Sequence, residues 1–216
     1  MAFYRRVGDV PRTRHTQHPN PEGGLYYEEL MGEEGFSSDS SLLYHRAIPS
    51  AIADAAEWQV PDQSRTRNAP LIPRHLKLHD LFPGQAWKDA DVVESRRLVL
   101  GNEDVRISYV AAGAPSQLYR NGIGDECVYV ESGQGRVETV FGALEVGGGD
   151  YVVIPRSTTH RWVPTGPEPL RAYAIEASSH IAPPKRYLSR YGQFLEHSPY
   201  CCLLYTSDAA DDSLRV

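Results

Sequence analysis

The chain has 216 residues, of which 22 are lysine or arginine and 28 are aspartate or glutamate, so its formal net charge is −6 at pH 7. A negative chain is a poor partner for nucleic acid or for an anionic membrane, and we expect neither. No apolar run is long enough to span a bilayer or typical of a signal peptide. Three cysteines give no disulfide framework, which favours a reducing, cytoplasmic setting.

The first third of the chain shows little periodicity. Residues 15–24 carry proline and glycine as a loop does. Residues 26–31 have the composition of a short helix, and residues 48–58 also have helical composition. We therefore expect residues 1–70 to form an irregular N-terminal arm, followed by a domain over residues 71–201.

Four histidines in this part of the chain come in close pairs. His75 and His79 bound a stretch that alternates polar and apolar residues, and we predict a strand there. Two histidines four residues apart can chelate a metal on a helix. On a strand they converge less readily, and no carboxylate stands at a suitable spacing. We interpret this pair, and the pair His15 and His18, as ordinary surface or core side chains.

The stretch after residue 98 is a series of short β-rich runs separated by glycine turns. Their β-branched, aromatic and alternating residues predict a hairpin over 99–110, then strands at 128–130, 136–140, 144–146, 151–154, 160–163 and 170–176. Strands this short, at this spacing, indicate an all-β antiparallel barrel or sandwich. We expect the barrel to run from about residue 75 to about residue 177.

Part of this series matches a known pair of motifs. His160 follows Gly149 and Pro155 at the spacing Gly-x5-Pro-x-Gly-x2-His, with Ser157 in the place of the second glycine. Glu126 stands at the glutamate position of the preceding motif. The segment resembles the two motifs of the cupin family. This resemblance implies a cupin-like antiparallel β-barrel, or double-stranded β-helix, a fold that often holds a transition metal.

The resemblance leaves the metal site half complete. The two histidine positions of the first cupin motif fall on Tyr119 and Asn121, and neither is a good ligand for a divalent first-row metal. One interpretation is a weak site built by Glu126 and His160 and completed by water. The other is a metal-free barrel in which hydrogen bonds satisfy both residues. We favour the second, because two protein ligands seldom build a dedicated site.

A further set of segments runs through the chain in a fixed order: residues 4–12, 24–32, 35–44, 46–50, 118–121 leading into 124–126, 183–188 and 192–197. Together they resemble homogentisate 1,2-dioxygenase, and its bacterial branch in particular. No single segment is diagnostic, but the ordered set is specific. The resemblance covers residue 1 to about residue 201.

This resemblance implies an activity and also where its machinery lies. The family pairs two cupin-like halves in a chain about twice as long, and assembles as a hexamer, a dimer of trimers. It opens the ring of homogentisate to maleylacetoacetate in tyrosine and phenylalanine catabolism, using Fe(II) and dioxygen. Two histidines and one glutamate of the C-terminal half hold the iron, and none of them maps onto this chain. We therefore expect no iron, catalytic or cofactor-binding residue here, and no activity of the chain alone.

The C-terminal residues look foreign to the fold. Residues 202–212 read CLLYTSDAADD, which matches the translation of a transposon end used in shotgun sequencing libraries. We expect residues 202–216 to be an adapter-derived tail and exclude them from fold reasoning. The natural reading frame is then expected to continue beyond residue 201.

Two other function classes remain open from the sequence. One is a stand-alone small cupin enzyme, such as an isomerase or a different dioxygenase, that uses Glu126 and His160. The other is a non-catalytic cupin domain that binds a ligand or assembles subunits. Tyr119 and Asn121 count against the first class, whereas the second is compatible with every pattern in the chain.

Overall fold

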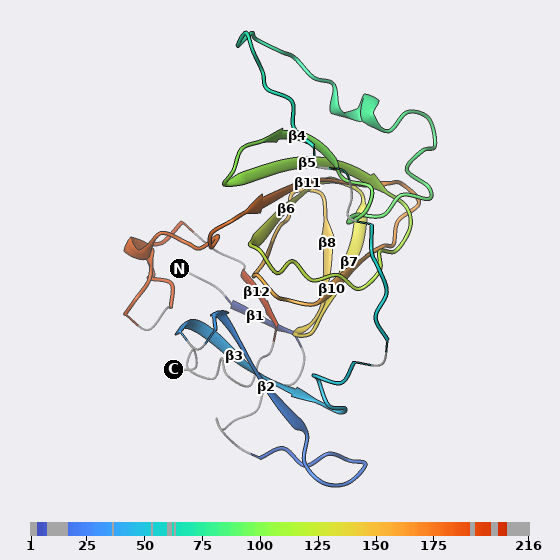
Figure 1. Ribbon diagram of the computed structural model, residues 1–216. Helices are drawn as coiled ribbons and strands as arrows, with labels where there is room; N and C mark the ends of the chain where they lie inside the picture. Colours follow the sequence, from blue (N-terminus) through green and yellow to red (C-terminus); the bar gives the residue numbers. More distant parts are fainter. Residues whose placement is uncertain are drawn as a thin grey trace. The chain divides into compact units, whose positions relative to one another are not determined.

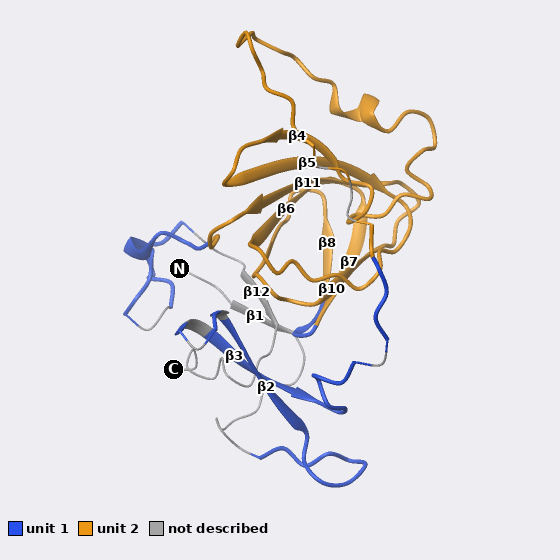
Figure 2. Cartoon of the chain, viewed as in Figure 1, with its two compact units in different colours: residues 1–57, 140–143, 182–216 blue, residues 58–139, 144–181 orange. Residues whose placement is uncertain are grey.

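The computed structural model describes residues 4–7, 17–35, 37–52, 54–59, 62, 64–190, 193–199 and 203–206. The chain divides into two compact units (Figure 2). The first comprises residues 1–57, 140–143 and 182–216, and the second, here called the barrel unit, comprises residues 58–139 and 144–181. In the part of the chain that the structure describes, no helix has the length and apolarity needed to cross a membrane.

Two sheets build the barrel (Figure 1). A five-stranded sheet has the order β4-β5-β11-β6-β9, and a three-stranded sheet has the order β10-β7-β8. The strands of the larger sheet are Arg97–Gly101 (β4), Val105–Ala112 (β5), Leu170–Ala177 (β11), Asp125–Ser132 (β6) and Tyr151–Ile154 (β9). Those of the smaller sheet are His160–Pro164 (β10), Gln134–Thr139 (β7) and Gly142–Gly147 (β8). All registered pairs in these sheets are antiparallel.

Alternation along the strands places the core inside the barrel. Every second residue of β11, beginning with Leu170, is buried, and its neighbours are partly exposed. The same phase in β6 buries Val128 and Val130 completely, and β10 contributes the fully buried Trp162. Because successive side chains of a strand point to opposite faces, one buried face per strand is sufficient to build this interior. The predicted all-β cupin-like antiparallel barrel is therefore confirmed, as are the hairpin over 99–110 and the strands predicted between residues 128 and 176.

The N-terminal region is more regular than its sequence indicates. The predicted helix at residues 26–31 is wrong, because Tyr27–Glu34 (β2) pairs antiparallel with Ser37–His45 (β3). The register sets Leu30 opposite Leu42, and cross-strand pairing of this kind outweighs the local helix propensity of Glu, Leu and Met. Residues 27–45 of the predicted arm therefore form a regular hairpin. No helix forms over the described part of residues 48–58 either.

The predicted strand at residues 75–79 is also wrong. Residues 71–77 carry no regular structure, and Leu78–Leu81 form a short 3-10 helix (η1). Leu76, which the alternation assigns to a buried face, is 55% exposed. Residues 75–79 have no neighbouring strand to pair with, so their alternating sequence does not form a strand.

The remaining elements belong to the first unit. Lys185–Tyr187 form a second 3-10 helix (η2), and Tyr4–Val7 (β1) pairs parallel with Leu203–Thr206 (β12). β12 lies within the stretch interpreted as an adapter-derived tail, whereas residues 207–216 fall outside the described residues. The origin of that tail and the predicted domain boundaries stay predictions.

Two neighbouring valines on β9 provide a matched test of the barrel interior. Val152 is 7% exposed and belongs to the core, whereas Val153 is 47% exposed. We expect Val152→Ala to lower the free energy of unfolding by about 2 kcal/mol, because it removes buried methyl groups and leaves a cavity. Val153→Ala should change it by less than about 0.5 kcal/mol. Urea denaturation followed by circular dichroism measures both, and equal losses would contradict the assigned faces of β9.

Candidate functional site

Two buried carboxylates face each other inside the barrel. Glu126 of β6 lies directly opposite Glu176 of β11 in the strand register. Their side chains are 0% and 9% exposed, respectively. Like charges directly opposite each other on a sheet are destabilising, and burial away from water increases the cost. This pair therefore requires a cation or a shared proton.

Arg96 supplies the cation. It immediately precedes β4, and its side chain is 4% exposed. Its Nη2 donates to Oε2 of Glu126 at 2.7 Å, and its Nη1 lies 3.5 Å from Oε1 of Glu176. Its Nε donates to the carbonyl of Val92 at 2.9 Å. Since guanidinium donors are fixed in one plane, this third bond holds the side chain in the orientation that reaches both carboxylates.

The turn before Arg96 is fixed by its own polar contacts. Oδ1 of Asp91 accepts hydrogen bonds from the backbone N–H groups of Val93, at 2.6 Å, and Glu94, at 2.9 Å. Such aspartate-to-backbone bonds are the usual way to stabilise a tight turn. Arg96 therefore extends into the barrel from a rigid support.

Asn121 links the two carboxylates from the other side. Its side-chain amide donates to Oε1 of Glu126 at 3.0 Å and lies 3.4 Å from Oε1 of Glu176. Its own Oδ1 accepts from the backbone N–H groups of Ile123, at 2.9 Å, and Gly124, at 3.2 Å. A Cβ on Gly124 would lie 1.7 Å from the carbonyl oxygen of Ala177, so this close approach of two backbones requires glycine.

His160 and Tyr119 lie together at the start of β10. The two backbones exchange hydrogen bonds of 2.8 and 2.9 Å, and the rings meet edge to face at 5.5 Å. Nδ1 of His160 lies 2.9 Å from the carbonyl of Thr158 and must donate to it, which leaves Nε2 as the acceptor. That Nε2 atom is buried and has no hydrogen-bond partner. Burial lowers the pKa of His160, so the ring is neutral at pH 7.

The two glutamates differ in their proton affinity. Burial alone opposes ionisation of Glu126, but Arg96 and the amide of Asn121 hold the pKa of Glu126 below its usual value. Burial raises the pKa of Glu176, and Arg96 offsets this effect only in part. Glu126 therefore contributes stability that is lost as the pH falls through its depressed folded pKa. Glu176 contributes stability that is lost as the pH rises through its elevated folded pKa.

These residues do not fit a divalent metal. The structure brings the predicted ligand positions Glu126 and His160 into the same barrel interior, but Glu126 already accepts from Arg96 and Asn121. A fixed guanidinium beside this carboxylate repels a second cation. Within the described ranges, no three His, Cys, Asp or Glu side chains are grouped so that they could hold a metal ion. Fe(II) is therefore poorly matched to the donor set of this barrel.

The three described histidines of the two sequence pairs have separate surroundings. His79 lies 3.2 Å from Glu131 on the exposed side of the sheet, and His75 is exposed. His18 packs edge to face on Tyr44 at 4.5 Å, while His15 lies outside the described residues.

Sequence reasoning missed Arg96 and Glu176. One signal for Glu176 was available, because it occupies the buried phase of β11 after Leu170, Ala172 and Ala174. A charge at an inward position of an otherwise apolar strand face indicates a buried partner. Arg96 carries no comparable signal, since it lies before a strand and among other charged residues.

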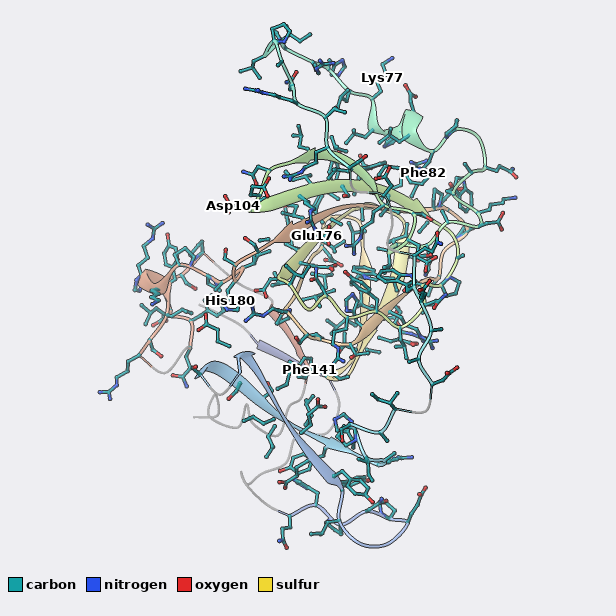
Figure 3. The ribbon with its side chains drawn as sticks, in the orientation of Figure 1. Lys77, Phe82, Asp104, Phe141, Glu176 and His180 are labelled. Carbon is teal, nitrogen blue, oxygen red and sulfur yellow. The ribbon has the colours of Figure 1, made fainter. Side chains whose placement is uncertain are left out.

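A cavity of about 250 Å³ adjoins this cluster. Figure 3 labels Glu176 and Asp104, which both line it. The wall also includes Trp58, Arg96, Tyr119 and Asn121. The cavity therefore borders on the charged groups of the barrel interior.

Comparison with known proteins agrees with the fold. Residues 107–176 match the family model of the cupin domain, which agrees with the barrel fold. A curated relative, "Putative dioxygenase SSO1533" of Saccharolobus solfataricus, is 37% identical over 202 residues, which are 93% of this chain and 50% of the relative. The chain thus spans about half the length of that relative.

Solved structures of low identity are similar in part of the chain. KdgF from Halomonas sp. is 24% identical, with a TM-score of 0.36 over 38% of this chain and 78% of that protein. The protein BH2720 from Bacillus halodurans is 21% identical, with a TM-score of 0.40 over 58% of this chain and 90% of that protein.

Removing Arg96 tests the charge arrangement. We expect Arg96→Met to lower the free energy of unfolding at neutral pH by about 3–5 kcal/mol, because it leaves two opposed carboxylates buried without a cation. The loss should shrink as the pH falls. Without Arg96, the pKa values of the two buried carboxyls should be higher in the folded variant than in its unfolded chain, so protonation favours the folded state. Urea denaturation at neutral and mildly acidic pH measures both effects.

The control for this experiment removes the charges together. Arg96→Met combined with Glu126→Gln and Glu176→Gln should recover part of the stability and lose the pH dependence. A loss in the single variant that does not change with pH would show that packing, not charge, explains it.

Proposed function

We propose that this cupin domain is a metal-free module of a larger ring-cleaving dioxygenase, in which it binds a ligand or assembles subunits and does not itself carry out oxygen chemistry. One observation carries the proposal: Arg96 donates to Glu126 at 2.7 Å, inside the barrel. The guanidinium of Arg96 thereby neutralises Glu126, the carboxylate that a metal ion would need as a ligand. Tyr119 and Asn121, in place of imidazole ligands, support the same reading.

The activity of the whole protein is the second part of the proposal. The name of the Saccharolobus relative supports a dioxygenase, and the ordered segments that resemble homogentisate 1,2-dioxygenase support homogentisate as the substrate. On this proposal Fe(II) is held by residues outside this chain, through two histidines and one carboxylate with open positions for substrate and oxygen.

A second candidate is a stand-alone cupin enzyme with a reduced metal site. One observation favours it: Nε2 of His160 is buried and has no hydrogen-bond partner. This nitrogen therefore keeps a free lone pair, which a metal ligand requires. To bind a metal, Glu126 would have to release Arg96, and this breaks a buried ion pair. That requirement makes this candidate the weaker of the two.

Iron content separates the two candidates. After anaerobic reconstitution with Fe(II) and gel filtration, we expect well below one iron per chain and no oxygen uptake with homogentisate. Plasma emission spectrometry and an oxygen electrode measure these quantities. One tightly held iron per chain that is lost in His160→Ala, but retained in the exposed control His79→Ala, would favour the stand-alone enzyme.

Assembly gives an independent test of the module. Large apolar side chains such as Leu118 (71% exposed), Ile123 (70%) and Tyr151 (69%) lie on the surface of the barrel unit. A contiguous exposed apolar patch above a few hundred Å² often marks an interaction surface. We therefore expect the chain to self-associate, and light scattering after size-exclusion chromatography measures its mass. A stable monomer over a wide concentration range would remove the support for an assembly role.

A further inference from the structure

A basic stretch of chain borders the outermost strand of the larger sheet. Residues 64–77, here called the arginine segment, carry four cations and no acidic side chain, although the whole chain has a net charge of −6. The cations are Arg65, Arg67, Arg74 and Lys77. Arg65 forms an ion pair of 2.7 Å with Glu103. Arg67 and Arg74 contact no carboxylate within the described ranges, so their charges are left without a counterion from this part of the chain.

The arginine segment and β4 together line an open recess of about 850 Å³, here called the arginine recess. Binding clefts typically have volumes of roughly 300 to 1,000 Å³. Its polar lining includes the three arginines and Asn68, whose Oδ1 accepts from Nε of Arg74 at 3.3 Å. Exposed or half-buried apolar side chains complete it: Ile72, Leu76, Leu98, Val99 and Leu100. The lining contains no acidic and no aromatic side chain.

The recess runs along the edge of β4 and not over one face of the sheet. Four consecutive residues of β4, numbers 98–101, line it, whereas no residue of β5 does. Successive side chains of a strand point to opposite faces, so a cavity over one face would be lined by alternate residues. A lining of consecutive residues therefore indicates the edge.

This edge of β4 is free to pair. β4 stands at the margin of the five-stranded sheet (Figure 1) and is registered with β5 alone. Among the described residues, no backbone hydrogen bond joins it to the arginine segment. An edge strand presents unpaired N–H and C=O groups that can accept a further strand. The five residues of β4 offer about 17 Å of such an edge.

These features together favour an extended peptide as the occupant. A peptide strand supplies backbone partners for the edge, while its alternate side chains reach the arginines and the apolar lining. A flat lipid surface would not reach the backbone of β4. Single-stranded nucleic acid would find no aromatic ring to stack on in this lining. A small inorganic anion would leave both the edge and the apolar side chains uncovered.

We propose that the arginine recess binds an extended acidic segment of a partner protein, which adds a strand to β4 and places its carboxylates against Arg67 and Arg74. Arg65 has a positioning role. It pairs with Glu103, and its Cδ lies 3.4 Å from where a Cβ on Gly101 would stand, so it holds the arginine segment beside β4. This surface goes beyond the proposed function and does not depend on the metal content of the barrel.

Fluorescence polarisation with short labelled peptides and the whole chain tests the charge. The probe is a hexapeptide that alternates valine and glutamate. We expect it to bind at least about tenfold more tightly than the same peptide with glutamine in place of glutamate, because hydrogen bonds between guanidinium and carboxylate are about twice as strong as neutral ones. Equal affinity of the two peptides, or no binding of the acidic one, would overturn the proposal.

N-methylation of the same peptide tests the added strand. Every second N–H of a paired strand points to its neighbour. Methylation of one alternate set of residues should therefore weaken binding at least about tenfold, whereas methylation of the other set should change it by less than about threefold. If both methylated peptides bind as well as the parent, the charges act without strand pairing and the proposal is wrong.

Paired arginine variants locate the site. Arg67→Gln combined with Arg74→Gln should weaken the acidic peptide by about tenfold or more. Arg46→Gln combined with Arg186→Gln removes the same charge from exposed positions outside the recess lining, and should leave the affinity unchanged. An equal loss in both double variants would show that only net charge attracts the peptide.

A second copy of the chain is the alternative occupant of the recess. Light scattering after size-exclusion chromatography should give the same mass for the unmodified chain and for Arg67→Gln combined with Arg74→Gln. A self-associated chain that becomes monomeric in this variant would assign the recess to a second copy and overturn the proposed partner.

Discussion

Two acidic side chains buried opposite each other on neighbouring strands are the constraint on which the interior of this barrel depends. Glu126 and Glu176 occupy one register position of β6 and β11, and both point into the core. Neither can turn outward, because a shift of one residue would expose every apolar side chain of its strand. The charges must therefore be compensated inside the barrel, and Arg96 with Asn121 provides that compensation.

This compensation differs in kind from a metal ion. A metal can leave and its ligands can be reloaded, whereas the guanidinium of Arg96 is tethered to β4 and held by the carbonyl of Val92. Its position depends on the turn that Asp91 stabilises, so the electrostatics of the interior are tied to the folding of this turn. Such a buried ion pair is poor evidence for extra stability, since desolvation offsets much of its attraction. Its effect is to exclude competing cations from Glu126.

The sequence predicted single strands and motif residues, but it did not predict contacts between residues that are distant in the chain. Strands such as Tyr151–Ile154 follow from β-branched and aromatic residues after a glycine turn, and Glu126 and His160 follow from motif spacing. The helix predicted at residues 26–31 failed because the partner strand of a hairpin decides the conformation there, and a single segment does not contain that information. Arg96 lies 30 residues from Glu126, and only the strand order places the two together.

Two of the unsatisfied buried atoms, one in the ion-pair cluster and one on the neighbouring histidine, share one property. Oε2 of Glu176 and Nε2 of the neutral His160 are both acceptors, so the site is short of donors. Arg96 and Asn121 supply the donors that the protein itself provides, and these are directed mainly at Glu126.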